Sequence, residues 1–382
     1  MLLNVCMNRE ELYLEMKAVE SKGLFSLARL YRVILDNLST ADNYSKSKSK
    51  NKNSNSNSNS KKKIVFVYNQ SDWCFDRLYQ SIKKYLSKFE IDKVQLGDNK
   101  HKLLDADLYI HRGISWLFVF NYPQETLKRV ISLIESERIF ENRRLIELNK
   151  IAGVIPLNNK IRSKLIENGI TNTYKVLCNG IDTEEFMPTV TKNSDIENKF
   201  IVGASGNFLL KSYDEWKGFS QYIVKAIQLC NKLSNSGVEL RWCGLKGRSY
   251  NGLVSTQIKL EDMPSFYNEL DCFVSMSKSE GCSGVIMEAL ASGIPVISTK
   301  VGWHYENCEE YKDGIIWTNR NGNSNIEQLQ NINELIDKIL YLRNNKQKRI
   351  QLSKNARNFA QRYGWHNTKD DWEGMIDFYT SN

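Results

Sequence analysis

The stretch Ser275–Gly302, SMSKSEGCSGVIMEALASGIPVISTKVG, decides the fold of this chain. It continues the apolar run Cys272–Val274, which predicts a short buried strand, and then breaks into a loop of small residues, Glu280–Gly284. A compact helix is expected over Val285–Ala291, and a second apolar strand over Ile294–Ser298. A strand, a glycine loop, a helix and a strand form a βαβ unit, so the sequence predicts a parallel sheet covered by helices.

The start of this helix has the features of an anion site. Ser283 is placed to cap the helix, and Gly293 lies just past its end. The first helical N–H groups, from Gly284 to Ile286, have no partners within the helix and lie at the positive end of its dipole. Gly281 and Gly284 leave room for a ligand to approach the backbone. A phosphate is the simplest anion to bind there.

Two carboxylates bracket the anion site. Glu280 lies at the strand end, and Glu288 lies about five helical residues beyond the cap, roughly 7–8 Å along the axis. Neither charge suits a phosphate, so each is expected to accept hydrogen bonds from hydroxyl groups on either side of it. A phosphate between two hydroxyl-rich groups describes a nucleotide sugar. The plainer alternative is that Glu280 caps a loop and Glu288 lies on a solvated helical face.

The pair Glu280 and Glu288, with seven residues between them and the tail Ala-Ser-Gly-Ile-Pro-Val, resembles the E-x7-E signature of retaining glycosyltransferases of family 4. The resemblance covers roughly Ile64 to the C-terminus. It implies an α/β protein with the GT-B fold, in which two Rossmann-like domains face a cleft and the second binds a nucleotide-diphospho-sugar.

Composition places no second activity in the chain. The net charge of +9 comes largely from seven lysines between Tyr44 and Lys63, and without them 46 basic residues face 44 acidic ones. We therefore expect no nucleic-acid partner. Eight cysteines without a C-x-x-C pair indicate reduced, buried thiols, and four scattered histidines predict no metal site. No signal peptide or bilayer-spanning run is visible, which favours a cytoplasmic protein, soluble or peripheral to a membrane.

The sequence predicts five segments: a helical extension over 1–43, a disordered Ser/Asn/Lys linker over 44–63, an acceptor domain over 64–190, a donor domain over 191–360, and a helix over 361–382 that crosses back to the first domain. The extension has one apolar face along Leu27–Leu38, which could pack on its own protein, on a second copy or on a membrane surface. Oligomeric state stays open.

The first domain begins with the expected strand Ile64–Tyr68, a loop and a helix to about Phe89. Later elements are expected as a strand at Asp107–His111, a helix at Glu135–Leu148, a strand at Ile151–Ile155, a helix at Lys160–Asn168 capped by Asn158, and a strand at Tyr174–Leu177. The motif Asp105-Ala106-Asp107 spells D-x-D but precedes its strand, so we interpret it as a strand-entry cap and not as a metal site.

In the second domain a strand over Phe200–Ala204 precedes Lys217, which matches the lysine with which family members grip the diphosphate. The arginine of that pattern is not cleanly matched: Asn207 lies near its position, and Lys211 could supply the charge. The resemblance implies that the donor is bound by Gly206, Asn207, Lys211, Gly281, Cys282, Ser283, Gly284, Val285 and Glu288.

The resemblance also implies the catalytic group. Lys217 would stabilise the leaving diphosphate, Glu280 would hold the sugar hydroxyls, and His111, at the end of its strand, would contact the sugar from the first domain. Asp72 and Trp73 are acceptor-side candidates. No cofactor is expected beyond the nucleotide-sugar substrate.

The sequence thus predicts a metal-independent hexosyltransferase that transfers a sugar to an acceptor hydroxyl with retention of configuration. A glycosidase, a GT-B nucleotide-sugar epimerase and a degenerate GT-B domain that only binds nucleotide are the alternatives. The donor sugar and base cannot be read from the sequence, nor can the acceptor, which could be a glycan, a lipid or a protein.

Overall fold

The computed structural model describes residues 61–68, 74–95, 105–113, 122–189, 199–206, 211–234, 237–244, 249–250, 253–254, 258–322 and 324–381. The predicted N-terminal helical extension and nearly all of the Ser/Asn/Lys linker lie outside these ranges. The candidate residues Asp72, Trp73 and Asn207 lie outside them as well.

The first of two parallel sheets has the strand order β2-β1-β3-β4-β5. Its strands pair in register from Ile64 opposite Leu108 to Ile134 opposite Pro156. Its elements in chain order are β1 (Lys63–Tyr68), α3 (Cys74–Tyr85), β2 (Glu90–Gln95), β3 (Leu108–Arg112), α4 (Gln124–Leu127), β4 (Val130–Ile134), η1 (Glu137–Glu141), η2 (Leu145–Lys150), β5 (Gly153–Pro156) and α5 (Asn159–Glu167).

The second parallel sheet has the order β12-β11-β10-β6-β7, which repeats the 2-1-3-4-5 connectivity of the first. Its elements are β6 (Phe200–Ser205), α6 (Lys211–Lys217), the π-helical turn η3 (Phe219–Val224), α7 (Lys225–Ser234), β7 (Val238–Cys243), the small hairpin β8 (Ser249–Tyr250) and β9 (Leu253–Val254), η4 (Leu260–Asp262), α8 (Met263–Asn268), β10 (Cys272–Ser275), α9 (Gly284–Ala291), β11 (Val296–Thr299), α10 (Gly302–Asn307), β12 (Ile315–Thr318), α11 (Asn325–Asn344) and α12 (Lys346–Arg362).

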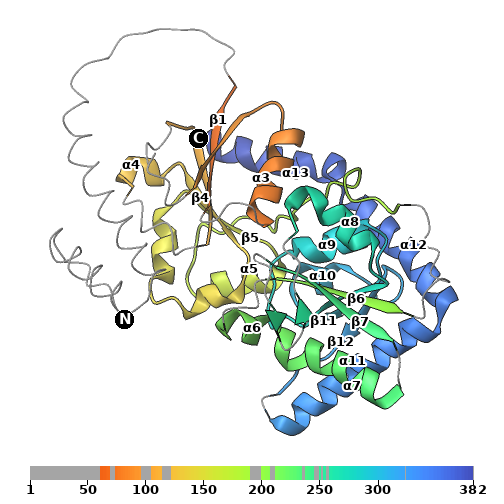
Figure 1. The fold of residues 1–382 in the computed structure, drawn as a ribbon. Helices are drawn as coiled ribbons and strands as arrows, with labels where there is room; N and C mark the ends of the chain where they lie inside the picture. The colour runs from red at the N-terminus through yellow and green to blue at the C-terminus, as the bar shows by residue number, and fades with distance from the viewer. Residues whose placement is uncertain are drawn as a thin grey trace, which may run out of the picture.

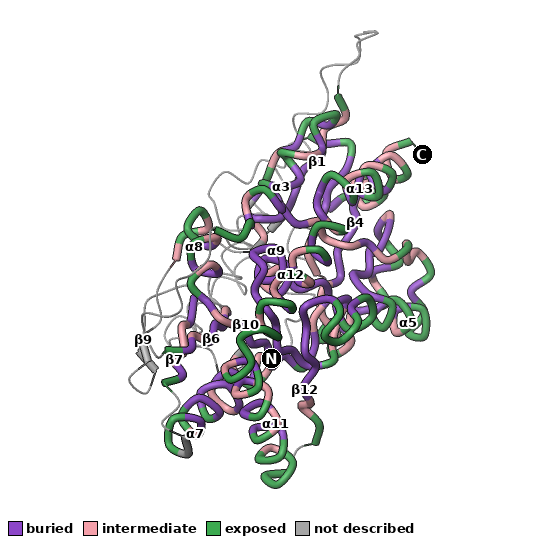
Figure 2. The backbone as a smooth tube through the Cα atoms, turned by 90° about the vertical axis from the view of Figure 1, so that its right-hand side faces the viewer, coloured by how far each residue is buried: buried purple, intermediate pink, exposed green. Residues whose placement is uncertain are grey.

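The predicted βαβ unit is confirmed. Cys272–Ser275 and Val296–Thr299 pair in parallel, Gly284–Ala291 is a helix between them, and Gly293 takes the left-handed φ of 70° that ends it. Both strands are buried along their whole length, as strands in the middle of a parallel sheet covered by helices are, and β10 is drawn purple in Figure 2.

The last helix, α13 (Trp365–Thr380), packs back on the first domain beside α3, as predicted (Figure 1). Trp365 stacks on Tyr85 at 6.0 Å between ring centroids, and Lys88 pairs with Asp377 at 2.9 Å. Trp365 and Trp372 are almost wholly buried, and truncating either to alanine would cost about 3–5 kcal/mol. This helix therefore fixes the two domains to one another.

Three predictions for the first domain are wrong. The helix expected at Glu135–Leu148 is two 3₁₀ helices, because Asn142 between them is extended and its side chain accepts from the Arg144 N–H. The strand expected at Tyr174–Leu177 reduces to backbone bonds to Val154 and Pro156, since a proline has no N–H with which to continue a ladder.

The helix expected to reach Phe89 ends at Tyr85, and the edge strand β2 follows it.

Candidate active site

The carboxyl ends of β6 and β10 form the switch point of the second sheet, where neighbouring strands lead off in opposite directions and ligands bind in open α/β sheets. A small cavity lies there, lined by Ser205, Lys217, Ile223, Phe273, Val274, Ser275, Met276, Ser277, Glu280 and Val285. The cavity holds about 10 Å³, which is roughly one water molecule. The predicted residues Lys217, Glu280 and Val285 are thus brought together, in a closed arrangement too tight for a nucleotide sugar.

Lys217 is delivered to this cavity by a left-handed turn. It is the last residue of α6, and Gly218 follows with φ of 69°. A Cβ on Gly218 would lie 2.8 Å from the Met276 carbonyl oxygen, so this position requires glycine both for its dihedral angle and for the close approach of the two segments. The Lys217 ammonium donates to the Glu280 carboxylate, and both side chains are largely buried.

Arg320 braces the turn that carries Lys217. Its guanidinium donates to the carbonyl oxygens of Glu215, Trp216 and Met276, which joins the end of α6 to the segment after β10. Its charge also lies 4.8 Å from the centre of the Tyr222 ring. Sequence reasoning missed this role, because Arg320 lies about a hundred residues from the turn it supports.

The loop before α9 packs directly on the first domain. A Cβ on Gly281 would lie 2.7 Å from the Cα and carbonyl oxygen of Glu135, whereas a Cβ on Gly284 would meet nothing within 4 Å. Ser283 is the N-cap residue by position, but its side chain makes no capping hydrogen bond, which corrects the expected cap. The N–H groups at the start of α9 are therefore not taken by that hydroxyl.

First-domain side chains hold this loop by its backbone. The Asn158 amide donates to the carbonyl oxygens of Glu280 and Gly281 at 3.0 and 3.3 Å, and its Oδ1 caps α5 by accepting from Ile161 at 2.7 Å. The Ser279 hydroxyl accepts from the Glu137 N–H at 3.2 Å. The cap at Asn158 was predicted, but its reach into the other domain was not.

Glu288 does not line the small cavity. It is buried in α9, where Tyr267 donates to its Oε2 at 2.8 Å and Arg77 of α3 lies 3.9 Å from its Oε1. Burial raises the pKa of Glu288 to about 7, although the charge of Arg77 opposes that rise. The Arg77 guanidinium also pairs with Glu185 and donates to the Leu260 carbonyl oxygen. A cation from the first domain thus meets the second glutamate of the signature across the domain interface.

His111 lies at the end of β3 but is enclosed, with no exposed surface. Its Nε2 shares a hydrogen bond of 2.7 Å with the Tyr122 hydroxyl, and burial lowers the pKa of His111 to about 3, so the ring is neutral at pH 7. It is not among the residues around Lys217 and Glu280. Its proposed contact with a sugar stays a prediction.

The remaining candidates are placed by their backbones. Gly206 follows β6, where its N–H donates to the Cys243 carbonyl oxygen at 3.0 Å, and Lys211 begins α6. Cys282 is buried in the loop Glu280–Gly284 before α9, which we call the signature loop. Asp107 accepts from the backbone N–H of Lys63 at 2.7 Å, at the entry to β3, as the strand-cap interpretation of the D-x-D motif requires.

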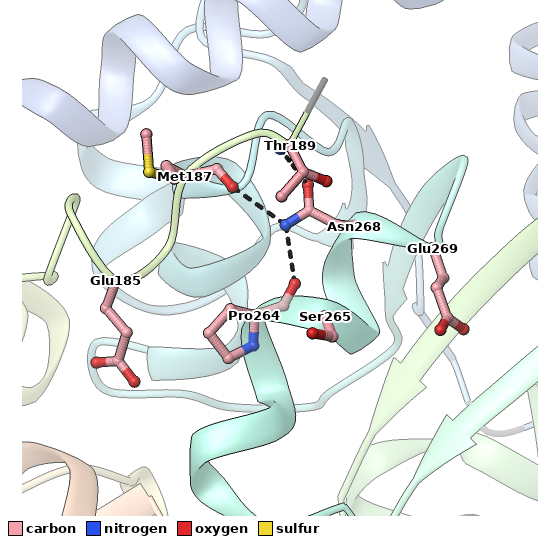
Figure 3. A pocket seen from close by; sticks show the side chains of 7 residues that line it. All are labelled: Glu185, Met187, Thr189, Pro264, Ser265, Asn268 and Glu269. Carbon is pink, nitrogen blue, oxygen red and sulfur yellow. Dashed lines mark hydrogen bonds between the residues drawn. The ribbon is translucent and has the colours of Figure 1, made fainter. Parts of the chain in front are cut away.

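A larger cavity of about 310 Å³ lies away from these residues, between α8 and the segment that joins the domains (Figure 3). Asn268 organises it by donating to the carbonyl oxygens of Met187 and Pro264 and accepting from the Thr189 N–H. Its lining contains none of the predicted site residues. Size alone therefore does not identify the site, and the switch point with its charged pair remains the candidate.

Residues 200–344 match the family described as glycosyl transferases group 1. An uncharacterized glycosyltransferase of Methanocaldococcus jannaschii is 26% identical over 214 residues, which cover 56% of this chain and 55% of the relative. One from Haemophilus influenzae is 23% identical over 323 residues, covering 82% and 85%. The chain thus aligns with about half the length of the first relative and most of the second.

Among solved structures, the Anabaena protein HepE in complex with UDP and glucose aligns with a TM-score of 0.60 and 17% identity, over 82% of this chain and 99% of that one. Together with the two parallel sheets, this likeness confirms the predicted α/β fold of GT-B type with two Rossmann-like domains. No helix within the described ranges is long and apolar enough to span a bilayer.

Proposed function

We propose that the protein is a glycosyltransferase that transfers a hexose from a nucleotide-diphospho-sugar to an acceptor hydroxyl, with retention of configuration and without a required metal. The observation that carries this proposal is the meeting of Lys217, Glu280 and the uncapped start of α9 at the switch point of the second sheet. The match of residues 200–344 to group 1 glycosyl transferases supports it, and so does the likeness to a structure solved with UDP and glucose.

The leaving group dictates the chemistry of this site. As the bond to the sugar breaks, negative charge grows on the diphosphate, so stabilising that charge is the main demand on the enzyme. Lys217 supplies a cation, and the N–H groups from Gly281 to Val285 supply dipoles that are already oriented. The diphosphate would take over the ammonium that Glu280 now holds.

The released Glu280 carboxylate would then accept from the sugar hydroxyls and orient the anomeric carbon. Glu288 would accept from the ribose hydroxyls, on a carboxylate that Tyr267 already orients. Neither glutamate needs to form a covalent intermediate. His111, neutral and enclosed, contributes no charge, and we propose that it contacts the sugar from the first domain.

The two domains must part for the donor to enter, because the loop before α9 packs on Glu135 and is hydrogen-bonded by Asn158 of the first domain. Reclosure would place the donor against an acceptor held by the first domain and would exclude water, which would otherwise hydrolyse the donor. We propose that the protein works in the cytoplasm, either soluble or peripheral to a membrane.

The test is calorimetric titration of the purified protein with UDP, GDP and ADP. Lys217→Met should lower the affinity for whichever of these nucleotides binds by about tenfold or more, because a charge-assisted contact to phosphate is lost. Lys338→Met is the matched control, since Lys338 pairs with Glu334 on α11 and does not line the cavity. Unchanged affinity in Lys217→Met would refute the assignment.

Turnover separates the proposal from its alternatives. When a panel of nucleotide sugars is tested in the presence of EDTA, the protein should slowly hydrolyse one donor. The sugar should be released as the anomer that keeps the configuration it had in the donor. Cleavage of a plain glycoside would identify a glycosidase, and interconversion of nucleotide sugars would identify an epimerase. Tight nucleotide binding with no turnover of any donor would identify a binding protein.

A further inference from the structure

Two cysteines face one another across the domain interface, beside the signature loop. Cys178 belongs to the segment that leads out of the first domain, and Cys282 is the middle residue of the loop Gly281-Cys282-Ser283. Their sulfur atoms lie 3.9 Å apart, although 104 residues separate them in the chain. The proposed chemistry at Lys217 and Glu280 uses neither thiol.

Both cysteines are held by their backbones, so this approach is built into the fold. The Trp372 indole of α13 donates to the Cys178 carbonyl oxygen at 3.0 Å. On the other side, the Gly281 carbonyl oxygen next to Cys282 accepts from the Trp303 N–H at 2.7 Å and from the Asn158 amide at 3.3 Å. A disulfide has an S–S length of about 2.05 Å, so the sulfurs need to approach by roughly 2 Å, a change within reach of side-chain rotation.

We propose that Cys178 and Cys282 form a thiol modification site, which a small disulfide of the glutathione class oxidises to a disulfide that ties the signature loop to the first domain. The Cys282 thiolate attacks one sulfur of the small disulfide and releases one small thiol. The Cys178 thiolate then attacks the Cys282 sulfur of that mixed disulfide and releases the second. The protein loses two protons and two electrons, and the small disulfide gains them as two thiols.

Burial and the neighbouring Cys282 thiol raise the pKa of Cys178, so little of it is thiolate at pH 7. The oxidation is therefore slow at neutral pH and is best driven near pH 8.5. A third thiol, Cys308 just after α10, is also buried; it helps to raise the pKa of Cys178, and burial together with Cys282 raises its own pKa. It is the competing partner, and the experiment must distinguish it.

The consequence for the site rests on the proposed function. Because the loop packs on Glu135 and is hydrogen-bonded by Asn158, a donor can enter only if the loop and the first domain separate. A bond from Cys178 to Cys282 would hold them together. The oxidised protein is therefore a closed form that binds nucleotide poorly.

The experiment treats the full-length protein with excess oxidised glutathione at pH 8.5, blocks free thiols and maps the peptides without reduction. We expect a linked peptide joining Cys178 to Cys282 in most molecules. It should be absent in Cys178→Ala and retained in Cys230→Ala, a control at a buried cysteine in α7. A Cys282–Cys308 link, glutathione adducts alone, or no reaction would overturn the proposal.

Calorimetry with UDP as the probe then tests the consequence. Oxidised wild type should bind UDP at least tenfold more weakly than reduced protein, and a reducing dithiol should restore the affinity. Cys178→Ala should bind equally well before and after oxidation. Equal UDP affinity of the reduced and the cross-linked wild type would overturn the inference that the disulfide closes the site. If reduced wild type binds no nucleotide, the proposed function fails, and the peptide map still decides whether the modification site exists.

Discussion

Glu288 offers the sharpest test of the domain interface, because its carboxyl group is buried within it. The charged and titratable groups that face it are Arg77 from α3, Glu185 from the connecting segment, Tyr267 from α8 and Cys243 from β7. Burial outweighs the attraction of Arg77 and raises the pKa of Glu288 from 4.5 to about 7. As pH rises, the carboxyl group of Glu288 therefore keeps its proton to a higher pH in the folded protein than in the unfolded chain.

The sign follows from linkage. Below pH 4.5 the carboxyl is protonated in both states, and its effect on stability is constant. As pH rises from 4.5 to 7 the unfolded chain binds fewer protons than the folded one, so the free energy of unfolding falls, and above pH 7 it levels off. Each pKa unit corresponds to about 1.36 kcal/mol, so the free energy of unfolding falls by about 2.5 kcal/mol between pH 5 and pH 8.

Glu288→Gln removes this titration and preserves the shape of the side chain. The assay is urea unfolding of both proteins between pH 5 and pH 8, followed by tryptophan fluorescence. The difference in the free energy of unfolding, variant minus wild type, should rise by about 2.5 kcal/mol from pH 5 to pH 8. The variant should also bind nucleotide more weakly. Glu167→Gln, at an exposed position of α5, is the control and should show no such trend. A gap between wild type and Glu288→Gln that is the same at pH 5 and pH 8 would refute the reasoning.

Two further pairs of substitutions probe the loop between the domains. Gly281→Ala would place a Cβ 2.7 Å from the Glu135 backbone and should cost about 1–3 kcal/mol in the free energy of unfolding, whereas Gly284→Ala meets open space and should cost nothing; calorimetric melting of both variants compares them. Asn158→Ala removes the cap of α5 and both cross-domain bonds, so urea unfolding should show a loss of about 1–2 kcal/mol. Asn158→Asp keeps the cap but has no amide to donate across the interface, so it should lose less than Asn158→Ala; full wild-type stability in Asn158→Asp would mean that the cross-domain bonds contribute nothing.

The elements that the sequence predicted correctly are those whose own residues dictate them. Strands β6, β10 and β11 are apolar runs buried on both faces, and α9 lies between small residues that fix where it begins and ends. In each case the pattern is complete within about ten residues. The same holds for the Asn158 cap, which needs only the backbone three residues ahead.

The missed elements lack such a local pattern. Strand β2 reads Glu-Ile-Asp-Lys-Val-Gln and lies at the edge of its sheet. An edge strand pairs on one side only and can be half polar, so β2 lacks the apolar run by which a strand is recognised. The contacts of Arg77 with Glu288 and of Arg320 with the Lys217 turn join residues that lie far apart in the chain, so no spacing in one sequence encodes them. The predicted pair Lys217 and Glu280 was found only because each matched a known pattern separately.

The loop before α9 belongs both to the proposed anion site and to the domain interface. Donor binding and closure of the interface are therefore coupled thermodynamically. Asn158 and Trp303 hold the carbonyl oxygens of the loop, while the Ser283 side chain leaves the start of α9 uncapped. If the Cys178–Cys282 bond weakens UDP binding tenfold, then saturating UDP must make that bond tenfold harder to form. For a two-electron couple this equals a shift of about 30 mV in the reduction potential of the pair. Titration against a glutathione buffer, with and without UDP, measures that shift, and a potential indifferent to UDP in a protein that binds UDP would show that loop closure and donor binding are independent.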